Sequence, residues 1–109
     1  MNQEKNYTRD DEEDSLQFIR RVINDQADRE RLRIVEQLVE IAVGEVKDCL
    51  CGLSAVATEK CLTVTVRHGG KRMDGRLLVI MRDYTDRVDY HPDGDKWVLT
   101  IYRYSVSQA

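Results

Sequence analysis

The chain has 109 residues, which is enough for one domain with a modest core and too few for two. Charged residues make up 34% of it, yet the formal net charge is only -3, so charges of both signs cover the surface without a strong overall field. This balance argues against a general nucleic-acid coat protein, which is usually clearly basic.

The first fourteen residues are polar and end in RDDEED, a run that cannot bury apolar area. We therefore expect residues 1–14 to form a disordered acidic tail and residues 15–109 to form a single α+β domain. The start of the chain has no apolar run typical of a secretion signal, and no window approaches the roughly 20 apolar residues of a membrane span. We expect a cytoplasmic protein that binds no membrane, with its three cysteines kept as thiols.

A short amphipathic helix is predicted over residues 15–24. Its apolar residues recur at helical spacing and comprise Leu16, Phe18, Ile19, Val22 and Ile23. Asp25 and Asp28 are acceptable caps for a second helix, so we expect a joint between the two.

The second helix is the clearest signal in the sequence. Its apolar seam steps by three and four residues through Leu32, Val35, Val39, Ala42, Val46, Cys49 and Leu53. Ile34, Leu38 and Ile41 widen this seam, so the helix must pack on a large apolar surface. Gly52 is the residue expected to end it.

Beyond Gly52 the apolar period changes to two. We predict strands over residues 61–67, 76–84 and 96–104, all rich in β-branched or aromatic residues. A turn at PDGD predicts a fourth short strand over residues 86–91 that pairs with 96–101. The order predicts an α+β fold, α-α-β-β-β-β, with two N-terminal helices packed on one face of a three- to four-stranded antiparallel meander sheet.

Strand parity divides these residues between two faces. The set expected to meet the long helix is Leu62, Val64, Val66, Leu77, Val79, Met81, Trp97, Leu99 and Ile101. The opposite face carries Leu78, Ile80, Tyr102 and Tyr104 and is too apolar for a face in water. Either a partner covers it, most economically a second copy in a homodimer, or the first short helix or the tail does.

Three cysteines and a histidine lie close together in sequence, namely Cys49, Cys51, Cys61 and His68. Cys49 falls on the helical seam, where a free cysteine behaves as a small apolar residue. Cys51 lies about 200° further round the same helix, so the two sulfurs cannot meet at one ion. We favour packing roles over a metal site and expect no metal and no cofactor.

An enzymatic role is not expected. A cysteine enzyme needs a thiolate beside a base, and the only histidines, His68 and His91, both fall in predicted loops. No phosphate-binding glycine loop, paired-histidine zinc motif or calcium loop occurs in the chain.

Two charged segments point to different partners. A basic hairpin loop able to follow a phosphate backbone holds Arg67, Lys71, Arg72 and Arg76. An acidic segment able to occupy a basic groove holds Asp83, Asp86, Asp89, Asp93 and Asp95. Either segment could instead be an ordinary solvated loop.

From these features we expect a non-enzymatic protein that binds a macromolecule. The favoured partner is a basic nucleic-acid-handling protein, met by the acidic segment as an inhibitor or accessory protein. The chain is similar to the small acidic inhibitors of phages and mobile elements, such as anti-CRISPR proteins, in size, charge and lack of catalytic groups, and the similarity covers no specific residue. The alternative is a small nucleic-acid-binding module that uses the basic 67–76 loop and the sheet tyrosines for stacking.

Overall fold

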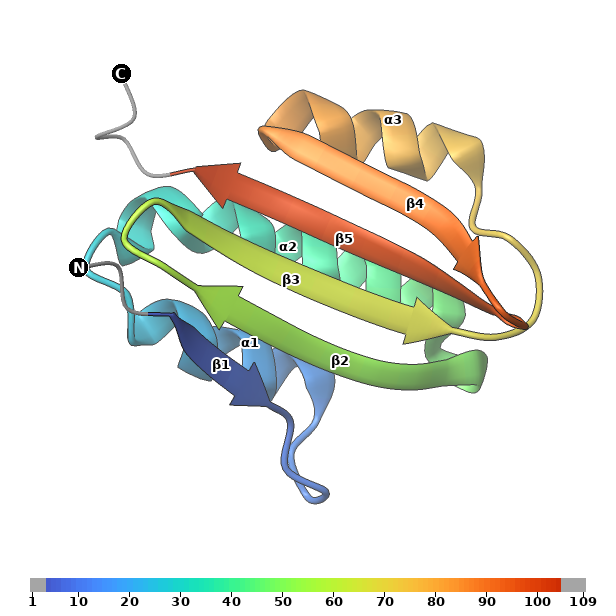
Figure 1. Ribbon diagram of the computed structural model, residues 1–109, viewed down its shortest axis with the longest axis horizontal. Helices are drawn as coiled ribbons and strands as arrows, with labels where there is room; N and C mark the ends of the chain where they lie inside the picture. Colours follow the sequence, from blue (N-terminus) through green and yellow to red (C-terminus); the bar gives the residue numbers. More distant parts are fainter. Residues whose placement is uncertain (1–3, 105–109) are drawn as a thin grey trace.

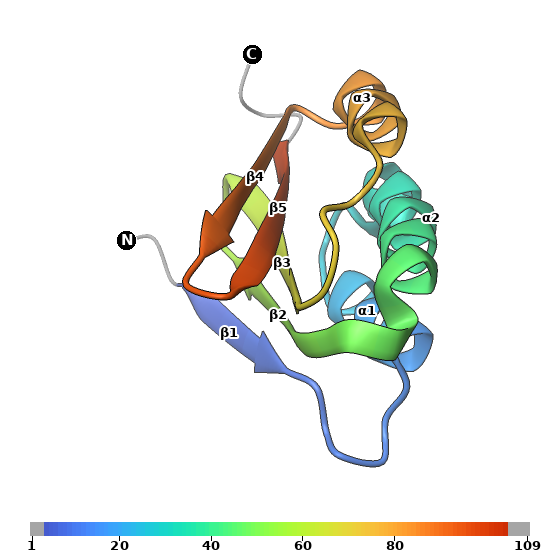
Figure 2. The ribbon, with the colours of Figure 1, turned by 90° about the vertical axis from the view of Figure 1, so that its right-hand side faces the viewer.

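The computed structural model describes residues 4–104 as an α+β fold (Figure 1). Its elements in chain order are β1 (Lys5–Thr8), α1 (Ser15–Asn24), α2 (Arg29–Val46), the short 3-10 helix η1 (Lys47–Cys49), β2 (Leu50–Ala57), β3 (Cys61–His68), α3 (Gly75–Tyr84), β4 (Arg87–Asp93) and β5 (Lys96–Tyr104). All neighbouring strands run antiparallel, in the order β1-β2-β3-β5-β4. Figure 2 shows all three helices on the same side of the sheet. None of the helices described is long and apolar enough to cross a membrane.

Helix α1 is confirmed with the predicted bounds, and its start is fixed by a reciprocal cap. The Gln17 N–H donates to Oδ1 of Asp14 at 2.8 Å, and the Asp14 N–H donates to Oε1 of Gln17 at 3.0 Å. This capping box satisfies two of the backbone N–H groups that a helix start leaves unpaired. Phe18 and Ile19 on its apolar side are at 0% exposure, and Leu16 near its start is partly buried.

Helix α2 is confirmed at its start, but it ends earlier than predicted. It stops at Val46 rather than near Gly52, and η1 leads into the unpredicted strand β2. Leu53 is therefore a strand residue and not part of the helical seam. Leu53, Ala55 and Ala57 are buried alternately along β2, a period of two that the small alanines made hard to see in the sequence.

The predicted tail contains a short strand within the residues that the structure describes. Lys5–Thr8 form β1, an edge strand paired with β2 in the register Tyr7 to Ala55. Tyr7 is the one apolar side chain of β1 that is buried. A single large residue in a polar run is too weak a signal to predict a strand.

The predicted strand over residues 76–84 is wrong, because this segment is helix α3. The Arg76 N–H donates to Oδ1 of Asp74, which caps the helix. Leu78 and Met81 are three residues apart and buried, whereas Val79 is 55% exposed. The core and solvent sides predicted for this segment are therefore exchanged at Leu78 and Val79.

The other predicted strands are confirmed, but the sheet is not a simple meander. Residues 61–67 and 96–104 lie in β3 and β5, and β4 over Arg87–Asp93 pairs with β5 as predicted. Because α3 separates β3 from β4, the chain returns so that β5 pairs with β3. The core forms where these strands meet the helices, and its strand residues at 0% exposure are Val64, Val66, Leu99 and Ile101.

Truncating a core side chain tests these assignments. We expect Val39→Ala and Leu99→Ala each to lower the free energy of unfolding by roughly 2 to 4 kcal/mol, because each leaves a cavity in the layer between α2 and the sheet. Urea denaturation measures the change. Val79→Ala is the control and should alter stability by less than about 0.5 kcal/mol. A large loss of stability in Val79→Ala would support the predicted strand over residues 76–84 and contradict helix α3.

Candidate functional site

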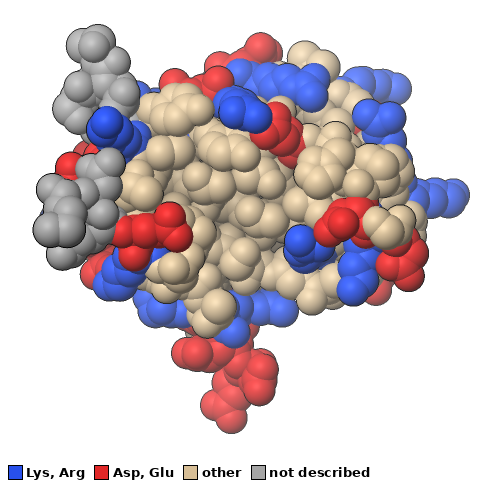
Figure 3. All heavy atoms as spheres, viewed as in Figure 1, with Lys and Arg blue, Asp and Glu red and all other residues tan. Residues whose placement is uncertain are grey.

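The side of the sheet away from the helices, here called the open sheet face, is uncharged at its centre. Since the strand residues that meet the helices alternate with outward ones, the register places four hydroxyl side chains in a row across β1, β2, β3 and β5. These are Thr8, Ser54, Thr65 and Thr100, each opposite the next. Figure 3, which views this face, shows charged side chains around an uncharged centre. None of the helices of residues 4–104 covers the face, and within the row Thr100 is buried by its neighbours at 9% exposure.

Two pairs of oppositely charged residues lie on the open sheet face. Arg87 Nη2 lies 2.8 Å from Oδ2 of Asp89, two residues along β4, and the Arg87 guanidinium lies 4.9 Å from the ring centre of Tyr102. Arg67 reaches from β3 to Asp93 at 2.7 Å. Hydrogen bonds from these arginines lower the pKa of both Asp89 and Asp93, so both carboxylates stay charged well below neutral pH.

The five predicted acidic residues follow one margin of the molecule, here called the acidic margin. They run from the end of α3 along β4, which is an edge strand, to the β4–β5 turn: Asp83, Asp86, Asp89, Asp93 and Asp95. Asp86 has a structural role, because the Tyr104 N–H donates to its Oδ2 at 2.8 Å. Asp89 and Asp93 instead lie on the outward side of β4, where their only ion-pair partners among residues 4–104 are surface arginines.

The predicted partner face is divided between two sides of the molecule. Tyr102 and Tyr104 lie on the open sheet face and are half-buried. Leu78 and Ile80 belong to α3 on the helical side, where Leu78 is 3% exposed and Ile80 is 47% exposed. The prediction of one continuous apolar sheet face is therefore wrong, because it depended on treating residues 76–84 as a strand.

The predicted basic residues are not a hairpin tip, because the loop that carries them links β3 to α3. Arg67 is paired with Asp93 on the open sheet face. The Arg72 guanidinium lies 5.5 Å from the ring centre of Trp97 and 5.7 Å from that of Tyr90, a cation–π arrangement. Lys71 and Arg76 are exposed. Two of the four basic groups thus already have partners within the chain.

A buried histidine fastens this loop to the sheet. His68 is fully buried, and its Nδ1 donates to the Gly69 carbonyl at 2.9 Å. In the neutral ring Nε2 then accepts the Tyr90 hydroxyl proton at 2.8 Å, and the Tyr90 oxygen accepts the Met73 N–H at 2.8 Å. Burial raises the pKa of Tyr90 and keeps the hydroxyl protonated. Sequence analysis did not find this network, whose members lie up to 22 residues apart.

The cysteines and His68 do not converge on one point. Cys61 begins β3 and His68 ends it, so they lie about 23 Å apart along the strand. Cys49 lies near the His68 end, where its carbonyl accepts the Gly69 N–H, and Cys51 is exposed on β2. Among residues 4–104, no three histidine, cysteine or acidic residues are placed to hold a metal ion. His91 is exposed on the open sheet face, whereas His68 points to the helical side two strands away, with β5 between them.

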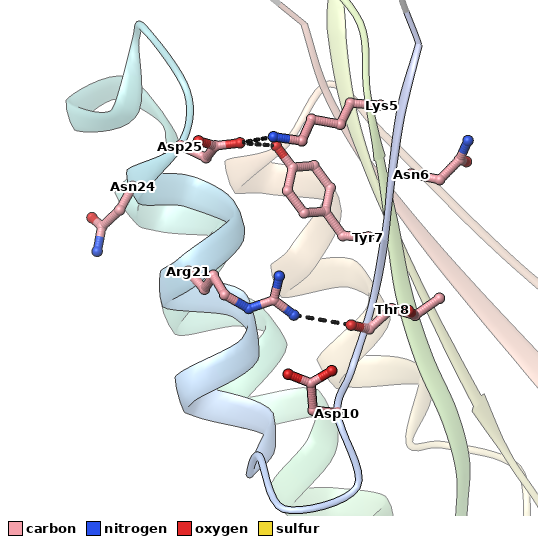
Figure 4. A pocket seen from close by; sticks show the side chains of 8 residues that line it. All are labelled: Lys5, Asn6, Tyr7, Thr8, Asp10, Arg21, Asn24 and Asp25. Carbon is pink, nitrogen blue, oxygen red and sulfur yellow. Dashed lines mark hydrogen bonds and ion pairs between the residues drawn. The ribbon is translucent and has the colours of Figure 1, made fainter.

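A shallow hollow of about 710 Å³ lies between β1 and α1 (Figure 4). Lys5 Nζ and the Tyr7 hydroxyl both donate to Oδ2 of Asp25 at 2.5 Å, and Arg21 donates to the Thr8 carbonyl at 2.9 Å. The bonds from Lys5 and then Tyr7 lower the pKa of Asp25. These groups hold the edge strand against the helix, which accounts for the hollow's polar lining.

Removing one hydroxyl tests the histidine network. Tyr90→Phe leaves His68 Nε2 and the Met73 N–H without their partner, so we expect the free energy of unfolding to fall by about 1 to 3 kcal/mol. Urea denaturation measures the loss. Tyr84→Phe, at a tyrosine that is 55% exposed, is the matched control and should change stability very little. Equal stability of the two variants would contradict the network.

Asp25 predicts a pH dependence for the attachment of β1. Because its pKa is lowered in the folded state, the stabilisation is present above the unfolded pKa of about 4 and is lost as the pH falls through the lower folded value. We expect wild type to be more stable than Asp25→Asn at pH 6, with the difference shrinking below about pH 4. Urea denaturation across this range measures it, and a difference that grew on acidification would contradict the pairing.

The molecule therefore presents a surface with an uncharged centre beside a margin on which carboxylates alternate with arginines, and its histidines and cysteines are dispersed. This arrangement can form hydrogen bonds and ion pairs with a large partner. In sequence comparisons the chain matches no known protein family and no curated protein.

Proposed function

We propose that this is a non-enzymatic binding protein, which docks a basic nucleic-acid-handling protein on the acidic margin and the adjoining open sheet face. The observation that carries the proposal is the packing of all three helices on one side of the sheet, which leaves β4 at an edge beside an uncovered face. Partners of this kind are inhibited or assisted by small acidic proteins of phages and mobile elements.

The carboxylates on β4 suit a basic protein surface. Their pairs with Arg67 and Arg87 are at the surface, where such pairs contribute only about 0 to 1 kcal/mol each. A lysine or arginine of a partner can therefore replace the internal arginine at little cost. The lowered pKa values keep Asp89 and Asp93 charged throughout the physiological range.

The same charges disfavour direct binding of nucleic acid to the sheet. A phosphate backbone on the open sheet face would meet Asp89 and Asp93, and the nearest arginines are already paired with them. The face of Tyr102 on which a base would stack is approached by the Arg87 guanidinium. A nucleic-acid module would have to use Lys71 and Arg76 on the loop side instead.

The contacts of the histidine and cysteine side chains support a non-enzymatic role. Both ring nitrogens of His68 are occupied by hydrogen bonds inside the fold. No cysteine of residues 4–104 makes a hydrogen bond to a histidine, so the thiolate and base pairing of a cysteine enzyme has no support here.

Neutralising the two outward carboxylates of β4 tests the proposal. We expect the double change Asp89→Asn and Asp93→Asn to slow association with a basic nuclease on the order of 10-fold at low salt, and less at high salt. Binding and cleavage are measured with purified RNA-guided and other basic nucleases. Asp86 is left intact because it binds the β5 backbone.

The matched control changes Asp11→Asn and Glu12→Gln, which alter the net charge equally in the β1–α1 turn and should leave binding unchanged. Duplex DNA and RNA are tested in parallel. Direct nucleic-acid binding that is lost on changing Lys71→Gln and Arg76→Gln, with no nuclease bound, would replace the proposal with the nucleic-acid module.

A further inference from the structure

The helical side of the molecule carries apolar side chains that do not pack into the core and remain exposed. The large apolar side chains that residues 4–104 leave exposed are all on α2 and α3: Ile41 at 49%, Val79 at 55%, Ile80 at 47% and Tyr84 at 55%. Isolated exposed apolar residues are ordinary, but a cluster on two adjacent helices points to a contact surface.

Around the circumference of α3, the apolar residues span a wider arc than the part that is buried against the core. Leu78 and Met81 are buried against the sheet, and Leu77 beside them is half-buried. Ile80 and Tyr84, one turn apart on the same side of the helix, continue the arc into solvent. The arc therefore extends past the core along one flank of α3.

On α2 a matching flank lies away from α1. Glu36 marks the α1 side, because it pairs with Arg20 at 2.7 Å. Ile34 and Ile41 lie about 140° to 160° round the helix from Glu36, and α3 packs on this other side of α2. Figure 2 shows α2 between α1 and α3. The two flanks thus adjoin in one patch of surface, here called the α2–α3 seam, which contains Ile34, Ile41, Leu77, Ile80 and Tyr84.

We infer that the α2–α3 seam is a homodimer interface, in which a two-fold axis parallel to the helices lays α2 of each copy over α3 of the other. This inference is independent of the proposed basic partner. The symmetric arrangement lets Ile41 and Ile80 of one copy meet Ile80 and Ile41 of the other, so one patch serves as its own complement.

Charge favours a second copy as the occupant. In Figure 1, α2 and α3 run in opposite directions, so the end of α2 that carries Glu45 lies beside the start of α3 that carries Arg76. The two-fold axis preserves this polarity and brings the Glu45 end of each copy over the Arg76 end of the other. Both residues are exposed, and opposite charges therefore meet on both sides of the two-fold axis at this one end of the interface.

The surface area of the α2–α3 seam limits how tightly the two copies can associate. α2 has 18 residues and is about 27 Å long, α3 has 10 residues and is about 15 Å long, and each helix is about 10 Å wide, which gives a flat footprint of roughly 400 Å² per copy. Even with the added area of a corrugated surface, the dimer belongs with the small, weak interfaces. A concentration-dependent dimer in the micromolar range is the expected form.

Solution mass measured from low micromolar to several hundred micromolar protein tests the inference. Wild type is expected to rise toward twice the chain mass of 12.7 kDa. Ile80→Asp is expected to weaken association on the order of 100-fold, because it places a charge at the interface centre. Since Ile80 is 47% exposed in the single chain, the variant should fold, as circular dichroism will verify.

Two matched control variants show where on the molecule the dimer interface lies. Val79→Asp changes the adjacent, equally exposed position about 100° round α3, on the flank away from α2, and should leave the dimer intact. Tyr102→Asp changes the open sheet face and should also leave it intact. A wild type that stays monomeric, or a dimer lost with Tyr102→Asp but kept with Ile80→Asp, would overturn the seam interface.

Charge reversal tests the two-fold arrangement. Arg76→Glu is expected to weaken the dimer roughly 10-fold, and adding Glu45→Lys to the same chain should restore most of the loss. Urea denaturation of each variant should show equal stability, so that restoration reports the contact between copies and not one within a chain. A dimer that does not respond to either change would contradict the symmetry proposed here.

Discussion

The packing of α2 on the central strands is the constraint on which the rest of the molecule depends. Val35 and Val39 of α2 are at most 1% exposed, and they belong to the same core cluster as Val64 of β3 and Leu99 of β5. Because β3 and β5 are the middle strands of the sheet, this contact fixes the face on which α1 and α3 must also lie. Both outer helices extend the apolar layer that α2 begins.

One-sided packing produces two surfaces of different chemistry. The open sheet face contacts no helix, so its centre uses hydroxyl side chains such as Thr65, which can face water or a partner. The helical side consists of curved, partly apolar surfaces, and Ile41 and Ile80 remain exposed there. Oppositely charged groups on the open sheet face form close ion pairs, such as the pair between Arg67 and Asp93. These pairs can select a partner with a matching charge pattern, although the net field of the face is weak.

The sequence predicted an element well wherever its apolar period was unambiguous. The steps of three and four residues defined the middle of α2, and the alternation in residues 96–104 defined β5. Residues 77–81 are all apolar and fit either period, so the assignment to a strand inverted Leu78 and Val79 and merged two surfaces that lie apart. The Asp74 cap was the local signal for a helix. The contact of His68 with Tyr90 is tertiary, and no local pattern encodes it.

A dimer formed at the α2–α3 seam leaves the open sheet faces of both copies free to bind a partner. A dimer formed through α2 and α3 points the two sheets away from each other, since the helices lie on the opposite side from the open face. Each copy then keeps its acidic margin accessible, and two partner molecules, or two sites on one partner, can be held at once. When both sites belong to one partner, the second contact forms within an existing complex, and its effective concentration depends on the spacing of the two margins. A weak dimer would thus strengthen binding most for partners whose basic sites match that spacing.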